Sequence, residues 1–268
     1  MTGARMNTLT ALRGDIERLE MHGDLHASRR VALGHAEADA VLRGGLAVAA
    51  LHEVFAEGHQ SAVATGFTAG LAGRVAPRRP LVWVRQDFSE LESGALSMRG
   101  LAELGLDPRC LVTVRAADNE SALRTAADAL ACDALGAVVL EVWGEPRLLD
   151  LVASRKLTLA AQASGVTGLL LRIAAVPAPS TAETRWIVRA AHSAPAAQAM
   201  PWSAWGAPVF DAELVRNRHG PVGRWIMEWN CDECLFRQPA DSQPVAAAPA
   251  HRSHQAPAHG VFERRRAG

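Results

Sequence analysis

Apolar positions in the central part of the chain form short runs separated by stretches with helical spacing. Runs of four to six mostly apolar residues predict buried strands, and apolar residues three and four apart predict helices between them. Strands alternating with helices favour an α/β fold with a mainly parallel sheet flanked by helices. The predicted strands are 50–55, 81–84, 110–114, 137–142 and 168–173, and the predicted helices are 62–71, 97–104, 120–130 and 148–164.

The pattern changes on both sides of this alternation. Segments 184–191, 208–216 and 223–229 look like strands joined by turns without intervening helices, which predicts an antiparallel C-terminal extension of the sheet. Residues 31–50 look like a turn-rich lead into the core, with Gly44 and Gly45 interrupting the pattern.

The N-terminal part, residues 1–30, is expected to form a short helix and a linker. Its apolar residues recur at spacings of three and four, as on one face of an amphipathic helix. That face needs a partner surface, which could belong to another protein or to the chain's own core. The residues are Leu9, Leu12, Ile16 and Leu19.

The core is expected to span residues 31–238 and to be followed by a disordered tail, 239–268. The tail is rich in Pro, Ala, Gln, Ser and His, a composition that buries too little apolar surface to fold. Near its end an aromatic residue precedes a cationic cluster that could contact a partner or DNA phosphates; a purely solubilising tail is the alternative. These residues are Phe262, Arg264, Arg265 and Arg266.

Composition narrows the class of protein. The 28 basic and 28 acidic residues balance, so no global field draws the chain to nucleic acid, and any DNA contact must be local. No run of about 18 apolar residues predicts a membrane span. The charged N-terminal residues do not resemble a secretory signal, and four cysteines fit free thiols in a reducing compartment. We therefore expect a cytoplasmic protein.

Three stretches carry a resemblance to a known family. Residues 31–55 resemble its lead into the first core strand, residues 100–123 its second unit, and residues 214–225 its late hairpin. Their order is similar to RecA and, more closely, to the ImuA family, RecA-like proteins encoded with error-prone polymerase components in many bacteria. The resemblance covers about residues 30–236 and implies a RecA-like core.

The same resemblance implies a role in SOS-induced, error-prone translesion DNA synthesis. It implies a protein partner, an ImuB-like member of the Y-family, with RecA as a further partner. Direct contact with DNA would be weak, and no membrane partner is expected. Two alternatives remain open: a RecA-fold ATPase with rewired phosphate contacts, and a cell-division inhibitor related to SulA.

The loop after the first core strand departs from a phosphate-binding loop. Such a loop ends in Gly-Lys-Ser/Thr, which supplies backbone N–H groups, a lysine for the phosphates and a hydroxyl for magnesium. Here Ser61, Ala62 and Val63 occupy those positions, and Glu57 adds a negative charge. We therefore expect no nucleotide cofactor and no enzymatic activity. The degenerate loop comprises Ala56, Glu57, Gly58, His59, Gln60, Ser61, Ala62 and Val63.

The ATPase alternative would need other residues to contact phosphate. His59, Gln60, Ser61, Thr65 and Arg74 are the candidates. Four acids lie at or just after the ends of the second and fourth strands, where an ATPase would orient water or hold magnesium; we favour structural roles for them. They are Asp87, Glu90, Glu141 and Glu145.

Tryptophans and arginines are interleaved in the second half of the chain, where they could form a single-strand DNA surface or a core beneath a solvated arginine face. The candidate partner or DNA contacts there are Arg216, Arg218 and Arg224. Cys231 and Cys234 are half of a zinc site at best, and we interpret them as free thiols, with no metal.

Overall fold

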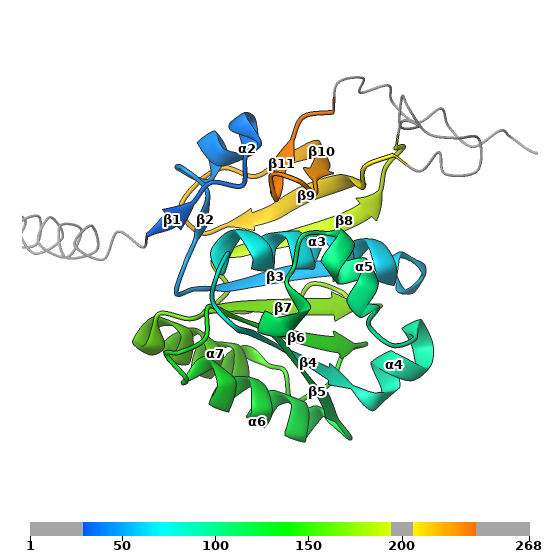
Figure 1. Cartoon of the computed structure of the whole chain (residues 1–268). Helices are drawn as coiled ribbons and strands as arrows, with labels where there is room; N and C mark the ends of the chain where they lie inside the picture. Colours follow the sequence, from blue (N-terminus) through cyan, green and yellow to red (C-terminus); the bar gives the residue numbers. More distant parts are fainter. Residues whose placement is uncertain (1–28, 194–205, 240–268) are drawn as a thin grey trace, which may run out of the picture.

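The computed structural model describes residues 29–193 and 206–239, and these form one nine-stranded sheet with helices on both faces, plus a small two-stranded sheet (Figure 1). The fold is α/β, as the alternation of strands and helices predicts. In chain order the elements are β1 (Arg30–Val31), α2 (Ala36–Val41), β2 (Leu46–Ala47), β3 (Leu51–Ala56), η1 (Gly58–Gln60), α3 (Ser61–Val75), β4 (Leu81–Gln86), α4 (Asp87–Ser93), α5 (Met98–Glu103), η2 (Pro108–Cys110), β5 (Leu111–Ala116), α6 (Asn119–Leu130), β6 (Ala137–Trp143), α7 (Leu151–Ser164), β7 (Thr167–Ile173), β8 (Thr184–Ala190), β9 (Val209–Asn217), β10 (Gly223–Asn230) and β11 (Leu235–Arg237).

The strand order in the large sheet is β11-β10-β9-β8-β3-β7-β6-β4-β5. The six strands from β8 to β5 are parallel, and β9, β10 and β11 add antiparallel pairs at one side. Central strands such as β3 and β7 are buried along their whole length, which is why their sequences are continuous apolar runs. The carboxyl ends of the parallel strands therefore form one edge of the sheet, and their amino ends form the opposite edge.

Two apolar cores lie on the two faces of the sheet. One packs α3 against the sheet and includes an aromatic cluster in which the Phe67 ring lies within 5.7 Å, centroid to centroid, of Trp186, Phe210 and Phe236. The other packs α6 and α7 on the opposite face, with Leu130 and Leu157 buried. The helices covering the α6–α7 face are capped where the sequence provides an acid: Asp118 for α6 and Asp150 for α7.

The structure corrects the expected topology at one strand. Segment 184–191 was expected to begin an antiparallel extension, but β8 pairs parallel to β3 and only its other neighbour, β9, is antiparallel to it. The ten-residue connection 174–183 carries the chain across β3 without a helix. Local apolar spacing reports whether a segment is extended but not its direction, so the predicted antiparallel extension is confirmed for β9, β10 and β11 and was wrong only for the pairing of β8 with β3.

Two short helices were not predicted. α4 follows β4 without an intervening loop, and α2 lies within the stretch expected to contain turns. α2 has only six residues and is held by side chains: His35 accepts from the Ala38 N–H, and the Asp39 carboxylate accepts from the backbone N–H groups of Leu33 and Gly34. In the described part of the chain, no helix is both long and apolar enough to cross a membrane.

Candidate functional site

The degenerate loop lies at the carboxyl edge of the sheet, between β3 and α3. β3 ends at Ala56, and α3 begins at Ser61, so only four residues connect them. Three of these form the turn η1. A phosphate-binding loop cradles phosphate with several successive backbone N–H groups ahead of the helix. Here the four connecting residues fold into a 3₁₀ turn that leads directly into the helix, and the N–H groups of Gln60 and Ser61 donate to the carbonyl oxygens of Glu57 and Gly58.

Neighbouring elements hold this short connection. A Cβ atom added at Gly58 would lie 3.2 Å from Cζ2 of Trp143, so the indole at the end of β6 lies directly against the turn. The Gln60 side chain accepts a hydrogen bond from the Ala190 N–H at 2.9 Å, which ties the turn to the end of β8. His59 and Gln60, both proposed for a rewired phosphate site, thus lie in the turn. The Gln60 side chain is already hydrogen-bonded to the backbone of Ala190.

The remaining residues proposed for a rewired site lie in two separate places. Ser61 and Thr65 line a cavity of about 310 Å³ between α3 and the segment that joins α4 to α5. Arg74, three turns further along α3, donates instead to the carbonyl oxygens of Ala32 and Cys234. His59 is exposed and lies 3.4 Å from the Glu57 carboxylate.

Arg85, which lines the 310 Å³ cavity, is already bonded to other protein groups. Arg85 donates from Nε and Nη2 to the two carboxylate oxygens of Glu141, from Nη1 to the Gly94 carbonyl and from Nη2 to the Ser93 hydroxyl. Glu141 also accepts from the Trp83 indole N–H at 2.9 Å. With both oxygens occupied, Glu141 joins β4 to β6 within the core, at the position where an ATPase would hold magnesium.

The other acids have structural partners too. Asp87 and Glu90 both pair with Arg115 of β5, at 3.0 and 3.3 Å. Glu145 accepts from the Val176 N–H and so fixes the loop after β7. The structural roles favoured for these residues agree with these contacts.

The C-terminal arginines differ in what they contact. Arg224 forms a two-point ion pair with Asp211, and Arg216 donates to the Ser180 carbonyl. The Arg218 side chain has neither a hydrogen bond nor an ion pair with any described residue, and it lines a pocket of about 940 Å³. Arg218 is therefore the candidate whose guanidinium remains available for a ligand.

The tryptophans of β8 and β10 belong to the core. Trp186 and Trp229 are fully buried, and the partly buried Trp225 packs against Trp186. These contacts favour the core interpretation over a stacking surface for bases, and Trp202 and Trp205 lie outside the described residues. Cys231 and Cys234 are free thiols, and burial raises the pKa of the Cys231 thiol. Among the described residues, no group of three or more His, Cys, Asp or Glu side chains could hold a metal ion.

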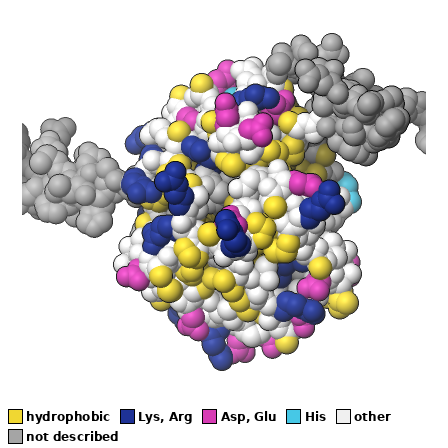
Figure 2. Space-filling model, in the orientation of Figure 1, with side chains coloured by type: hydrophobic (Ala, Val, Ile, Leu, Met, Phe, Trp, Pro, Cys, Tyr) yellow, Lys and Arg dark blue, Asp and Glu magenta, His cyan; other side chains and the backbone are white. Residues whose placement is uncertain are grey.

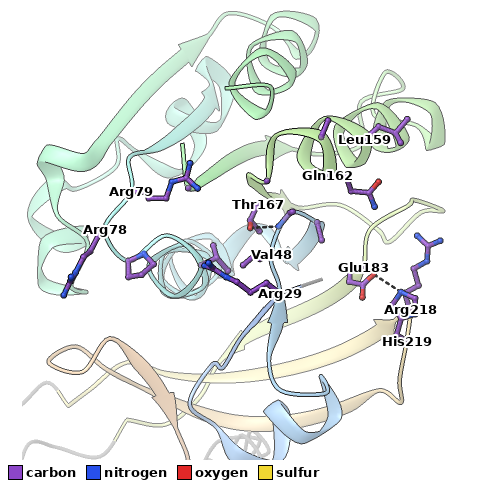
Figure 3. Close-up of a pocket in the computed structure, with 17 residues that line it drawn as sticks. Arg29, Val48, Arg78, Arg79, Leu159, Gln162, Thr167, Glu183, Arg218 and His219 are labelled. Atoms are coloured by element: carbon purple, nitrogen blue, oxygen red, sulfur yellow. Dashed lines mark hydrogen bonds and ion pairs between the residues drawn. The ribbon is translucent and has the colours of Figure 1, made fainter. Parts of the chain in front are cut away.

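Sequence reasoning missed a pocket at the opposite edge of the sheet, which we call the amino-edge pocket. It encloses about 940 Å³ beside the amino ends of β3, β6 and β7 (Figure 3). The Arg78-Arg79 pair was the available signal, because adjacent arginines immediately before a buried strand must lie at the amino end of that strand. The lining contains the arginines Arg29, Arg78, Arg79 and Arg218, together with His219.

Several predicted contact residues lie outside the described residues: Leu9, Leu12, Ile16, Leu19, Phe262, Arg264, Arg265 and Arg266. A scan against protein-family models and a search of curated proteins both find no match to this chain.

Proposed function

We propose that this protein is a non-catalytic, RecA-like accessory factor of error-prone translesion DNA synthesis, of the ImuA type. It acts by binding an ImuB-like Y-family protein, with RecA as a further partner. The observation that carries the non-catalytic part is the 3₁₀ turn between Ala56 and Ser61, whose backbone N–H groups are bonded within the turn and which Trp143 and Gln60 hold against the neighbouring strands. A triphosphate would find neither a backbone cradle nor a lysine there.

The α/β sheet supports the RecA-like part of the proposal. Its parallel strands and the added antiparallel strands agree with what the sequence resemblance implies for residues 30–236. The acids expected at an ATPase centre are used as structural ion-pair and hydrogen-bond partners, which is consistent with a core kept for its shape.

An exposed apolar surface on α7 supports action by binding. Leu151 and Val152, in its first turn, are 52% and 61% exposed, and Leu148 just before it is 52% exposed. Neighbouring exposed apolar side chains are typical of protein interaction sites. We assign this surface, defined by Leu148, Leu151 and Val152, to the Y-family-like partner.

The test is capture of an ImuB-like Y-family protein after co-expression of the two full-length proteins. The wild-type protein should retain the partner, and Leu151→Ser with Val152→Ser should weaken capture at least tenfold. Leu91→Ser is the matched control, because Leu91 is 82% exposed on α4 and lies outside the assigned surface. No capture by the wild-type protein would overturn the proposal.

The ATPase alternative has one observation in its favour, the cavity beside Ser61 and Thr65. ATP turnover that disappears in Ser61→Ala or Thr65→Val would favour it over the accessory role. Cell filamentation on overexpression, without partner capture, would favour the division inhibitor.

A further inference from the structure

Positive charge gathers at the amino edge of the sheet, although the chain as a whole is neutral. In Figure 2, dark-blue side chains lie along the left side of the molecule, where the amino ends of the parallel strands lie in Figure 1. The amino-edge pocket is hollowed into this side. Its lining contains four arginines and one glutamate, so its charge is strongly positive.

The single acid of the lining does not neutralise these arginines. Glu183 lies 3.4 Å from the Arg30 guanidinium and 3.4 Å from Nε2 of His219. Its charge is therefore balanced by Arg30, which lies outside the lining. Arg29, Arg78 and Arg218 have no side-chain hydrogen bond or ion pair with another described residue.

Arg79 retains its charge as well. Its guanidinium donates to the backbone carbonyl of Asp133, a neutral acceptor that positions the side chain without compensating it. The pocket thus holds four guanidinium groups. Glu183 is the only acid among the described residues of the lining, and its charge is balanced by Arg30.

The basic side chains of the lining lie on opposite sides of the pocket. In Figure 3, Arg78 and Arg79 lie on one side, Arg218 and His219 on the other, and Arg29 between them. These side chains come from three separate places in the chain: the segment before β1, the turn before β4, and the turn between β9 and β10. One phosphate cannot engage both sides of a 940 Å³ pocket at once, so the arrangement fits a ligand that carries several.

The chemistry of the lining favours a phosphate backbone over bases. Guanidinium groups bind phosphate oxygens at two points, whereas base recognition without sequence preference relies on aromatic stacking. The lining contains no Phe or Trp, and its apolar residues are small or aliphatic, such as Val48 and Leu159. A concave site bounded on two sides admits a flexible single strand more readily than a rigid duplex.

We propose that the amino-edge pocket binds the phosphate backbone of single-stranded nucleic acid. This proposal rests on the pocket and stands whether or not the chain is an ImuA-type factor. The site lies at the edge of the sheet opposite the degenerate loop and uses only one of the arginines that the sequence suggested, Arg218.

The test is fluorescence anisotropy of a labelled 15-nucleotide oligo-dT with the full-length protein at low salt. Arg78→Glu with Arg218→Glu should weaken binding at least tenfold. The control is Arg99→Glu with Arg147→Glu, the same charge change at two exposed arginines outside the pocket, and it should alter affinity less than twofold. Because single-strand binding releases about 0.7 counterions per phosphate contact, the salt dependence should also become shallower in the pocket variant.

Competition with unlabelled anions distinguishes the classes of ligand that the pocket could bind. Unlabelled oligo-dT should displace the probe at lower charge concentration than polyglutamate or tripolyphosphate. Equal displacement by polyglutamate would identify a surface for acidic proteins, and equal displacement by tripolyphosphate would identify a small-anion site; either result overturns the proposal. So does wild-type protein that fails to bind oligo-dT, or a control variant that loses as much affinity as the pocket variant.

Discussion

Arg85 and Glu141 form a buried, two-point ion pair between β4 and β6, with N–O distances of 2.8 Å on both contacts. Their side chains are 6% and 1% exposed. Glu141→Ala should lower the free energy of unfolding by about 3–5 kcal/mol, because it leaves the Arg85 charge buried and uncompensated. Urea denaturation at neutral pH measures this loss.

Two comparisons isolate the burial. Glu120→Ala removes an exposed i,i+4 pair with Arg124 and should cost about 0.5 kcal/mol or less. Replacing both buried partners, Arg85→Met with Glu141→Leu, should recover much of the loss. If Glu141→Ala lowered the free energy of unfolding as little as Glu120→Ala does, the Arg85 charge would not depend on Glu141 for compensation.

His52 makes the fold sensitive to acid. Its Nε2 lies 2.8 Å from the Ala47 carbonyl, which can only accept, so Nε2 carries the proton and Nδ1 accepts from the Thr184 hydroxyl. Complete burial lowers the pKa of His52 from 6.5 to about 4, against the opposing effect of the Ala47 carbonyl.

Because the pKa in the folded state is lowered, the unfolded chain binds a proton at His52 first as the pH falls. The stability that this residue contributes is present above pH 6.5 and is lost as the pH falls toward about 4, a change of about 3 kcal/mol. Urea denaturation across this range should show a decline that is smaller in His52→Gln than in the wild type. Parallel pH profiles for the two proteins would contradict the assignment.

Two glycines of α3 should respond to alanine in opposite directions. At Gly70 an added Cβ would lie 2.8 Å from Cζ of Phe236 and 3.1 Å from the Trp229 ring, and both rings are buried. Gly70→Ala should destabilise by about 1–3 kcal/mol through overpacking. At Gly66 the nearest contact is an ordinary 3.6 Å, so Gly66→Ala should stabilise by up to about 1 kcal/mol. Thermal unfolding of the two variants tests the pair; a stabilised Gly70→Ala would contradict the close packing.

The main strands could be predicted because each core strand is a short, nearly continuous apolar run. Leu81–Gln86 and Thr167–Ile173 are buried along their length, and no other local pattern competes with that assignment. The direction of β8 could not be predicted in the same way, because parallel and antiparallel strands share the same side-chain period. Only its pairing with β3 decides it.

The candidate sites were harder to predict because they depend on residues far apart in the sequence. The amino-edge pocket joins Arg29, Arg78 and Arg218, which only the folded sheet brings together. The degenerate loop was identified from missing residue types, whereas its 3₁₀ turn depends on backbone hydrogen bonds that residue types do not report.

Restoring the missing side chains of the degenerate loop should not restore nucleotide binding. If only side chains were missing, Ala62→Lys with Val63→Thr would supply the lysine and the hydroxyl of a phosphate-binding loop. In the structure, however, the residues before α3 form a 3₁₀ turn in which the N–H groups of Gln60 and Ser61 already donate to backbone carbonyl oxygens. Trp143 lies against Gly58, where backbone N–H groups would have to open around phosphate.

We therefore expect the double variant to fold and still to show no saturable ATP binding in calorimetry at micromolar protein concentration, with or without magnesium. Adding Trp143→Ala removes the ring beside Gly58 and should not restore binding either, because the N–H groups of Gln60 and Ser61 remain hydrogen-bonded within the turn. Micromolar binding by the double variant would mean that the loss was confined to side chains. Binding that appears only after Trp143→Ala would instead assign the loss to the indole, and both results would contradict the argument from the backbone of the turn.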